Sequence, residues 1–112
     1  MAALAVMAGA FGAHALEGLL TEERLSTYET AVRYHMYHAI ALILVGWIGR
    51  RRKGAMLQWA GFLFLGGILL FSGSLYALVL TEVLLLGMIT PLGGVAFIVG
   101  WLLFARGAAQ PY

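Results

Sequence analysis

The sequence predicts an all-α integral membrane protein, a single four-helix bundle with both termini in the cytoplasm. The first reason is composition: 62% of the 112 residues are hydrophobic and 11% are Asp, Glu, Lys or Arg, against roughly 25% charged residues in a soluble domain. A chain with so few charged residues lacks the polar surface that a soluble protein needs to cover its core. We therefore expect the apolar excess to face lipid. The second reason is a cationic run between two apolar segments, Arg50, Arg51, Arg52 and Lys53, which marks a cytoplasmic loop.

Four apolar segments approach the roughly 20 residues that a helix needs to cross a bilayer. We expect spans at about 1–20, 26–49, 54–80 and 83–105. The first is rich in alanine and glycine. The second is expected to begin at Ser26, because Ser26 and Glu29 have the spacing of a capping box.

The third and fourth segments differ in how sharply they are defined. The third, which follows the cationic loop, is the clearest. The fourth contains Pro91, which leaves two alternatives open: a kinked helix, or a helix that begins at Pro91 with Thr90 as its cap.

The acidic residues agree with a cytoplasmic position for the Arg50–Lys53 loop. With that loop inside, alternate crossings place both termini inside and the two other turns outside. All five glutamates then lie toward the outer side: Glu17, Glu22, Glu23, Glu29 and Glu82. The charge distribution therefore predicts one orientation for the whole chain.

Each segment carries small residues through which helices can approach closely in lipid. The glycines that we expect at helix contacts are Gly9, Gly12, Gly46, Gly66, Gly73, Gly93 and Gly94. Four grooved helices exceed what one bundle needs. A groove that the bundle leaves unused predicts a homo-oligomer or a place in a larger membrane complex.

Ionisable residues within a membrane span are candidates for function, because their burial in lipid is costly. His14 and Glu17 are near neighbours on the first segment, and His35 and His38 share one face of the second. His14 and His38 lie at similar depth. They could hold a divalent metal or haem, or pass protons, but the favoured interpretation is interhelical hydrogen bonding alone, with no cofactor or metal.

Several functional classes find no support in the sequence. There are no cysteines and no aspartates, and no catalytic motif is present. The sequence pI near 9.3 reflects mainly the one cationic loop, so membrane topology explains it better than binding to nucleic acid. We therefore predict a protein without catalytic activity that contacts lipid.

Four blocks of the sequence together resemble the YgdD/YwdK-type family of small membrane proteins. The blocks are Phe11-Gly12-Ala13-His14-Ala15-Leu16, the segment from Tyr28 to Ala39, the segment from Leu70 to Tyr76, and Ile89-Thr90-Pro91-Leu92-Gly93-Gly94. The resemblance implies a four-span protein of the bacterial inner membrane and a family of unknown function. The recurrent polar positions that it implies here are His14, Glu29, Tyr34, His38, Ser72, Ser74, Tyr76 and Thr90.

Most of these polar positions lie in the outer half of the expected bundle. We therefore expect one outward-facing polar site, with Glu17 and His35 as secondary members. The predicted role is a small non-catalytic binding or assembly module. The alternative is a minimal transporter or channel for an ion, a proton or a small solute, working through His14, His38 and Glu29, and a haem- or metal-bearing redox subunit is less favoured.

Overall fold

The structure, a computed structural model, describes residues 1–111 and contains helices and no strands in that range. This confirms the all-α prediction. The elements in chain order are α1 (Ala2–Phe11), η1 (Gly12–Leu16), α2 (Glu22–Gly49), α3 (Ala55–Gly67), η2 (Ile68–Ser72), α4 (Gly73–Thr81), η3 (Leu84–Met88) and α5 (Thr90–Ala109).

Several of these elements join into longer rods. The π-helical segment η1 continues α1, and the π-helical η2 connects α3 to α4. Within the described residues, three helical stretches are long and apolar enough to cross a membrane: Glu22–Gly49, Ala55–Thr81 and Leu84–Ala109. The first rod, Ala2–Leu16, is apolar but shorter, so a fourth crossing there stays a prediction.

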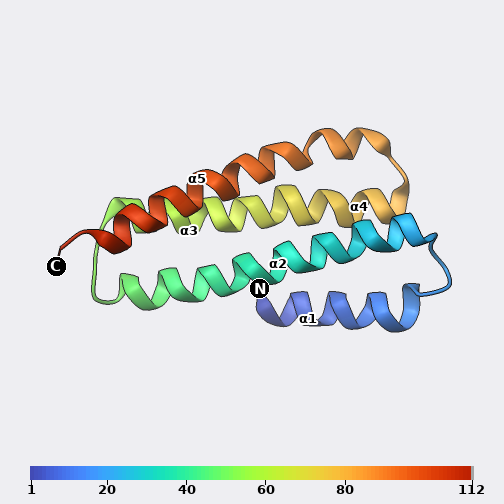
Figure 1. Cartoon of the computed structure of the whole chain (residues 1–112), viewed down its shortest axis with the longest axis horizontal. Coiled ribbons are helices and arrows are strands. Elements are labelled where there is room, and N and C mark those ends of the chain that lie inside the picture. Colours follow the sequence, from blue (N-terminus) through green and yellow to red (C-terminus); the bar gives the residue numbers. More distant parts are fainter. Residues whose placement is uncertain (112) are drawn as a thin grey trace.

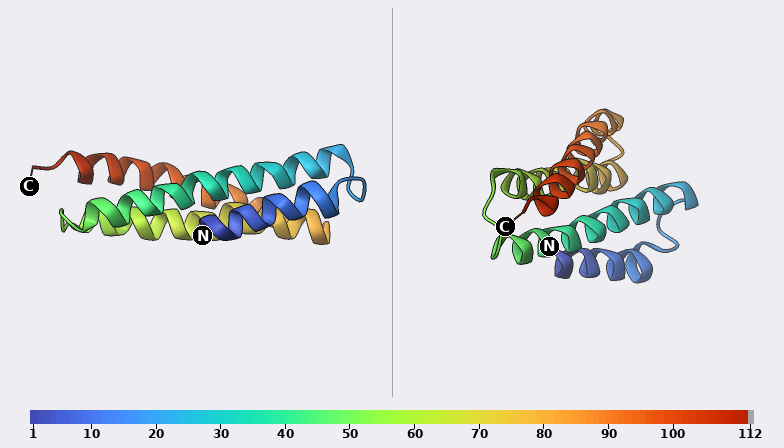
Figure 2. Two further views of the ribbon diagram at one scale, coloured as in Figure 1. Left: turned by 90° about the horizontal axis from the view of Figure 1, so that it is seen from below. Right: turned by 60° about the vertical axis from the view of Figure 1, so that its left-hand side comes forward.

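The rods form an elongated, flattened assembly of 52 × 26 × 15 Å (Figure 1). The α3–α4 rod lies between α2 and α5, and α1 packs chiefly against the far side of α2 (Figures 1 and 2). The arrangement is a three-helix core with α1 at its edge. The four rods of the expected four-helix bundle are present, and α1 packs chiefly on α2 at the edge of the other three.

Two clusters of buried apolar side chains hold the rods together. The larger lies between α2, α3 and α5 and contains Ala41, Ala60, Phe64, Ile68 and Phe97. The smaller joins the end of the first rod to α2 and α4 through Leu16, Tyr28 and Val79. Both clusters draw on α2 and on the α3–α4 rod, so these two rods hold the two ends of the molecule together.

The helix that was expected to begin at Ser26 begins four residues earlier, at Glu22. Thr21 is its cap, and the Thr21 hydroxyl accepts a hydrogen bond of 3.2 Å from the backbone N–H of Arg24. Glu22 and Glu23 occupy the first turn, where their negative charges interact favourably with the positive end of the helix dipole. The capping-box assignment to Ser26 was wrong because Thr21 followed by two acids is the stronger start signal.

The first rod ends at Leu16 rather than near residue 20. Glu17 adopts an extended conformation there. The next residue, Gly18, has φ +84°, a left-handed conformation that glycine adopts without steric cost. The chain therefore leaves the helix one turn earlier than hydrophobicity alone suggests.

The structure resolves the two alternatives for Pro91 in favour of a helix start. A separate 3-10 segment, η3, precedes α5, which begins at Thr90 with Pro91 in its first turn. Thr90 does not serve as the cap: Ile89 holds that position without a side-chain hydrogen bond, and the Thr90 hydroxyl instead lies 2.6 Å from the hydroxyl of Ser74 on α4. Proline is tolerated at this position because its missing N–H would have had no partner within the helix.

Arg24 ties the first turn of α2 to the end of α4. Its guanidinium lies 3.1 Å from the Glu82 carboxylate and also donates to the backbone carbonyl of Val79. Glu82 follows α4 in the left-handed region, at φ 60°. The carbonyls of the last turn of a helix lack hydrogen-bond partners within that helix. Arg24 of α2 provides such a partner for the Val79 carbonyl of α4.

The expected glycine contacts divide into two groups. Gly9, Gly12 and Gly93 lie against neighbouring helices: a Cβ on Gly12 would sit 2.5 Å from the Tyr28 ring, and one on Gly93 would sit 2.4 Å from the backbone nitrogen of Phe71. A Cβ on Gly46 or Gly66 would meet nothing within 4 Å, and one on Gly73 or Gly94 would meet only ordinary contacts near 4 Å. The second group therefore has room beside it.

Candidate functional site

His38 occupies the centre of the three-helix core. It is 3% exposed, and its ring stacks on Phe97 with centroids 3.4 Å apart and an interplanar angle of 6°. Trp101 Nε1 donates a hydrogen bond to His38 Nε2 at 3.0 Å, and His38 Nδ1 lies 2.7 Å from the Tyr34 carbonyl oxygen. Because an indole nitrogen only donates, these partners assign a neutral ring with its hydrogen on Nδ1.

Both ring nitrogens of His38 are thus engaged: Nε2 joins α2 to α5, and Nδ1 contacts the preceding turn of α2. A metal or haem iron needs a free imidazole nitrogen, and here it would have to displace Trp101 or the Tyr34 carbonyl. His14 lies exposed at the end of the first rod. The structure therefore does not bring His14 and His38 together as a ligand pair.

His35 lies one turn before His38 on α2 and forms a different contact. It is 5% exposed, and its Nδ1 lies 3.0 Å from the hydroxyl of Tyr76 on α4. The Tyr76 ring in turn packs against Tyr28, whose hydroxyl donates to the Ala8 carbonyl of α1 at 2.6 Å. These two hydrogen bonds and the ring contact between them link α1, α2 and α4, while the buried Nε2 of His35 has no partner among the described residues.

The hydroxyls of the Leu70–Tyr76 block also make contacts between helices. Ser72 is fully buried and donates to the Ala31 carbonyl of α2 at 2.7 Å. Ser74 pairs with Thr90 at the start of α5, and its hydroxyl also lies 2.9 Å from the Phe71 carbonyl. Each serine therefore bonds the α3–α4 rod to a different neighbour, Ser72 of η2 to α2 and Ser74 of α4 to α5.

The remaining predicted residues lie on the surface. Glu29 and Arg33 line a shallow cavity between the first rod and α2, together with Gly9, Gly12, Ala13, Tyr28 and Val32. His14 and Glu17 are exposed nearby in sequence. Among residues 1–111, no three His, Cys, Asp or Glu side chains lie close enough together to hold a metal ion.

The predicted single outward-facing site is therefore distributed over several separate contacts. His38, Ser72, Ser74, Tyr76 and Thr90 bond neighbouring helices, Tyr34 contributes its carbonyl and an aromatic contact with Phe71 at 4.7 Å, and Glu29 and His14 face outward. Sequence reasoning missed Trp101 and Arg24 as partners in these contacts. Their spacing along the chain gives no signal, because 63 residues separate His38 from Trp101 and 55 separate Arg24 from Val79.

Comparison with known proteins supports the resemblance of the four blocks. A family model described as "Protein of unknown function (DUF423)" matches residues 8–94. The UPF0382 membrane protein SAB0533 of Staphylococcus aureus is 50% identical over 102 residues, which cover 91% of this chain and 83% of that protein.

Two further relatives give similar values. The UPF0382 membrane protein YwdK of Bacillus subtilis is 48% identical over 110 residues, covering 97% of this chain and 89% of its own length. The UPF0382 membrane protein SERP0230 of Staphylococcus epidermidis is 52% identical over 101 residues, covering 90% and 82%. No solved structure shows significant similarity to the chain.

The family match covers most of the chain, the relatives are named as membrane proteins, and three helical stretches have the length and hydropathy of membrane spans. The chain therefore belongs to the DUF423 (UPF0382) family of small membrane proteins, whose function is unknown.

Proposed function

We propose that this protein is a non-catalytic helical module of the bacterial inner membrane that works by associating with other membrane chains, including copies of itself. The observation that carries the proposal is the use of its polar side chains: those within the helices bond one helix to the next, as His38 does with Trp101 and Ser72 with Ala31. Such bonds stabilise helix packing in lipid. They leave the outward faces of the helices as the surface through which the module acts.

A transport role for the region of His14, His38 and Glu29 is less well supported. A proton or ion path needs groups that exchange partners along a continuous route. His38 has both nitrogens engaged in the core, and His14 and Glu29 lie on the surface. The three residues therefore do not line one path.

The cationic loop at residues 50–53 faces the cytoplasm in this proposal, because Lys and Arg resist transfer across the bilayer. The chain has no cysteine, so single-cysteine variants report the side directly. With a membrane-impermeant maleimide, we expect Leu84→Cys to be labelled from outside the cell and Lys53→Cys to be labelled only after permeabilisation. The opposite pattern would reverse the proposed orientation.

The α3–α4 rod offers the best surface for self-association. Gly66 has open space beside it, and Phe62 and Leu69 flank it at 65% and 61% exposure. A small residue between large ones lets a second helix approach closely in lipid. We propose that a second copy packs on this face.

Oxidative cross-linking of single-cysteine variants tests this face. We expect Leu69→Cys to form disulfide-linked dimers in membranes, and the added substitution Gly66→Leu to reduce the dimer several-fold. The matched control is Leu102→Cys on α5, which has similar exposure at 62% and should cross-link weakly. Equal cross-linking at positions 69 and 102, or no effect of Gly66→Leu, would show that this face is not the interface.

A further inference from the structure

The two ends of the molecule carry opposite charge. Arg50, Arg51, Arg52 and Lys53 connect α2 to α3 at one end, and Arg106 lies in the last turns of α5 at the same end. The other end of the 52 Å assembly (Figure 1) holds the loop after the first rod, with Glu17, the first turn of α2, with Glu22 and Glu23, and the end of α4, with Glu82. Since the hydrocarbon core of a bilayer is about 30 Å thick, the cationic end lies at the level of lipid headgroups.

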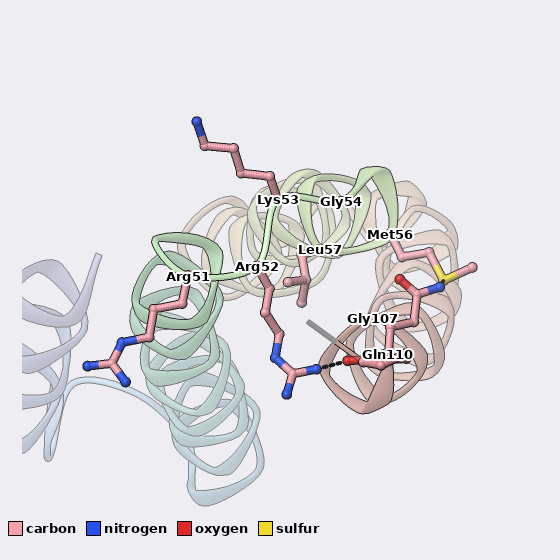
Figure 3. A pocket seen from close by; sticks show the side chains of 9 residues that line it. Arg51, Arg52, Lys53, Gly54, Met56, Leu57, Gly107 and Gln110 are labelled. Atoms are coloured by element: carbon pink, nitrogen blue, oxygen red, sulfur yellow. Dashed lines mark hydrogen bonds between the residues drawn. The ribbon is translucent and has the colours of Figure 1, made fainter.

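Two of the cavities at the cationic end differ in the helices and side chains that surround their openings. One lies between the loop and the end of α5, and there Arg52 donates to the backbone carbonyl of Gln110 (Figure 3). Figure 3 shows the Lys53 side chain directed away from α5, toward the other side of the loop. That side holds the second cavity, a groove between α2 and α3.

The α2–α3 groove combines an apolar floor with a cationic mouth. Its floor is formed by Val45, Gly46 and Gly49 of α2 and by Leu57 of α3, with Gln58 at its side, and its mouth by Arg50, Arg52, Lys53 and Gly54. A Cβ added to Gly46 or Gly49 would meet nothing within 4 Å. The groove is therefore open along the backbone of α2, and no carboxylate lines it.

We propose that this groove binds a phospholipid with an anionic headgroup, with the headgroup phosphate between Arg50 and Lys53 and an acyl chain along Gly46 and Gly49. Charge complementarity selects the headgroup, because basic pockets between membrane helices attract anionic lipids. The apolar floor selects a lipid over a free phosphate ion, since only a lipid brings an acyl chain to the groove. The groove is distinct from the Gly66 face proposed for self-association, which has no cations around it in this chain.

Quenching of tryptophan fluorescence by brominated lipids tests the proposal on the whole protein. The protein is held in phosphatidylcholine vesicles, and brominated phosphatidylglycerol or brominated phosphatidylcholine replaces a small fraction of the lipid. We expect brominated phosphatidylglycerol to quench at several-fold lower mole fraction and to saturate. Inorganic phosphate, compared with chloride at equal ionic strength, should leave this quenching unchanged.

Two pairs of variants separate a built groove from general attraction to a cationic surface. Gly46→Leu fills the floor and should reduce the preference for the anionic lipid at least threefold, whereas Gly94→Leu on α5, where the nearest atom to an added Cβ is 4.0 Å away, should keep it. Arg50→Gln with Lys53→Gln should remove the preference, whereas Arg106→Gln should keep most of it. The proposal is overturned if the two brominated lipids quench equally, if Gly46→Leu behaves as the native chain, if Arg106→Gln matches the double substitution, or if phosphate competes.

Discussion

Substituting Gly93 with alanine is expected to lower the free energy of unfolding by about 1–3 kcal/mol, the range for overpacked cores. The added Cβ would lie 2.4 Å from the backbone nitrogen of Phe71 and 2.7 Å from its Cβ. A flexible side chain could turn aside, but the backbone of the α3–α4 rod cannot. The whole of α5 would have to move outward, and its contact near Gly67 and Phe97 would loosen with it.

Gly94→Ala is the matched control, because the nearest atom to its Cβ would be Phe71 Cδ2 at 4.0 Å. We expect Gly94→Ala to change stability by no more than about 0.5 kcal/mol. Unfolding in mixed detergent micelles, followed by loss of helical circular dichroism, measures both variants. Equal stability of the two variants would contradict the close contact of α5 with Phe71.

His38→Ala is expected to destabilise the protein by about 2–4 kcal/mol, as truncation of a large buried side chain does. The substitution removes the ring that stacks on Phe97 and contacts Phe64 at 5.6 Å between centroids. It also removes the acceptor for Trp101 Nε1. His14→Ala, at an exposed position, serves as the control and should change stability by less than about 0.5 kcal/mol.

A double-mutant cycle separates the hydrogen bond from the packing. Trp101→Phe removes the donor while keeping an aromatic ring, and interhelical hydrogen bonds in membranes contribute on average about 0.6 kcal/mol. We expect His38→Ala and Trp101→Phe to be coupled by an amount of that order. Strict additivity of the two substitutions would show that the contact between His38 and Trp101 contributes nothing to stability.

The helical class and the membrane environment follow from composition and from the length of the apolar runs. The start of α5 near Pro91 was one of two alternatives that the sequence allowed, since proline permits a helix start and disfavours an uninterrupted helix. Helix boundaries at α1 and α2 were less accurate. Thr21 competes with Ser26 as a cap, and Gly18 ends the first rod inside an apolar stretch, so local hydrophobicity was a poor guide there.

The glycines show where sequence reasoning about packing stops. Periodicity places Gly46, Gly66 and Gly93 on helix faces but does not say which face meets a neighbour. Gly93 lies against Phe71, whereas Gly46 and Gly66 have open space beside them. Gly66 and Gly67 are neighbours in the sequence, yet only Gly67 lies in close contact with Phe97. Nothing in the surrounding residues distinguishes the two.

For the candidate site too, the sequence identified the polar residues and the structure identified their partners. Polar residues within the spans could be identified from sequence, because their presence in lipid requires a partner. Which partner each one finds depends on how the rods cross: His38 meets Trp101, His35 meets Tyr76, and Ser72 meets the Ala31 carbonyl. None of these pairings follows from spacing along the chain.

By itself, the sequence determined that this chain forms apolar helices with its cations gathered at one turn, because hydropathy and charge act residue by residue. Only the tertiary structure decided that α2 and the α3–α4 rod share both buried clusters, that α1 lies at the edge, and that polar residues of the expected site form separate interhelical bonds. The physical reason is that packing in lipid depends on close fit between particular surfaces, and such fit exists only once the helices have met.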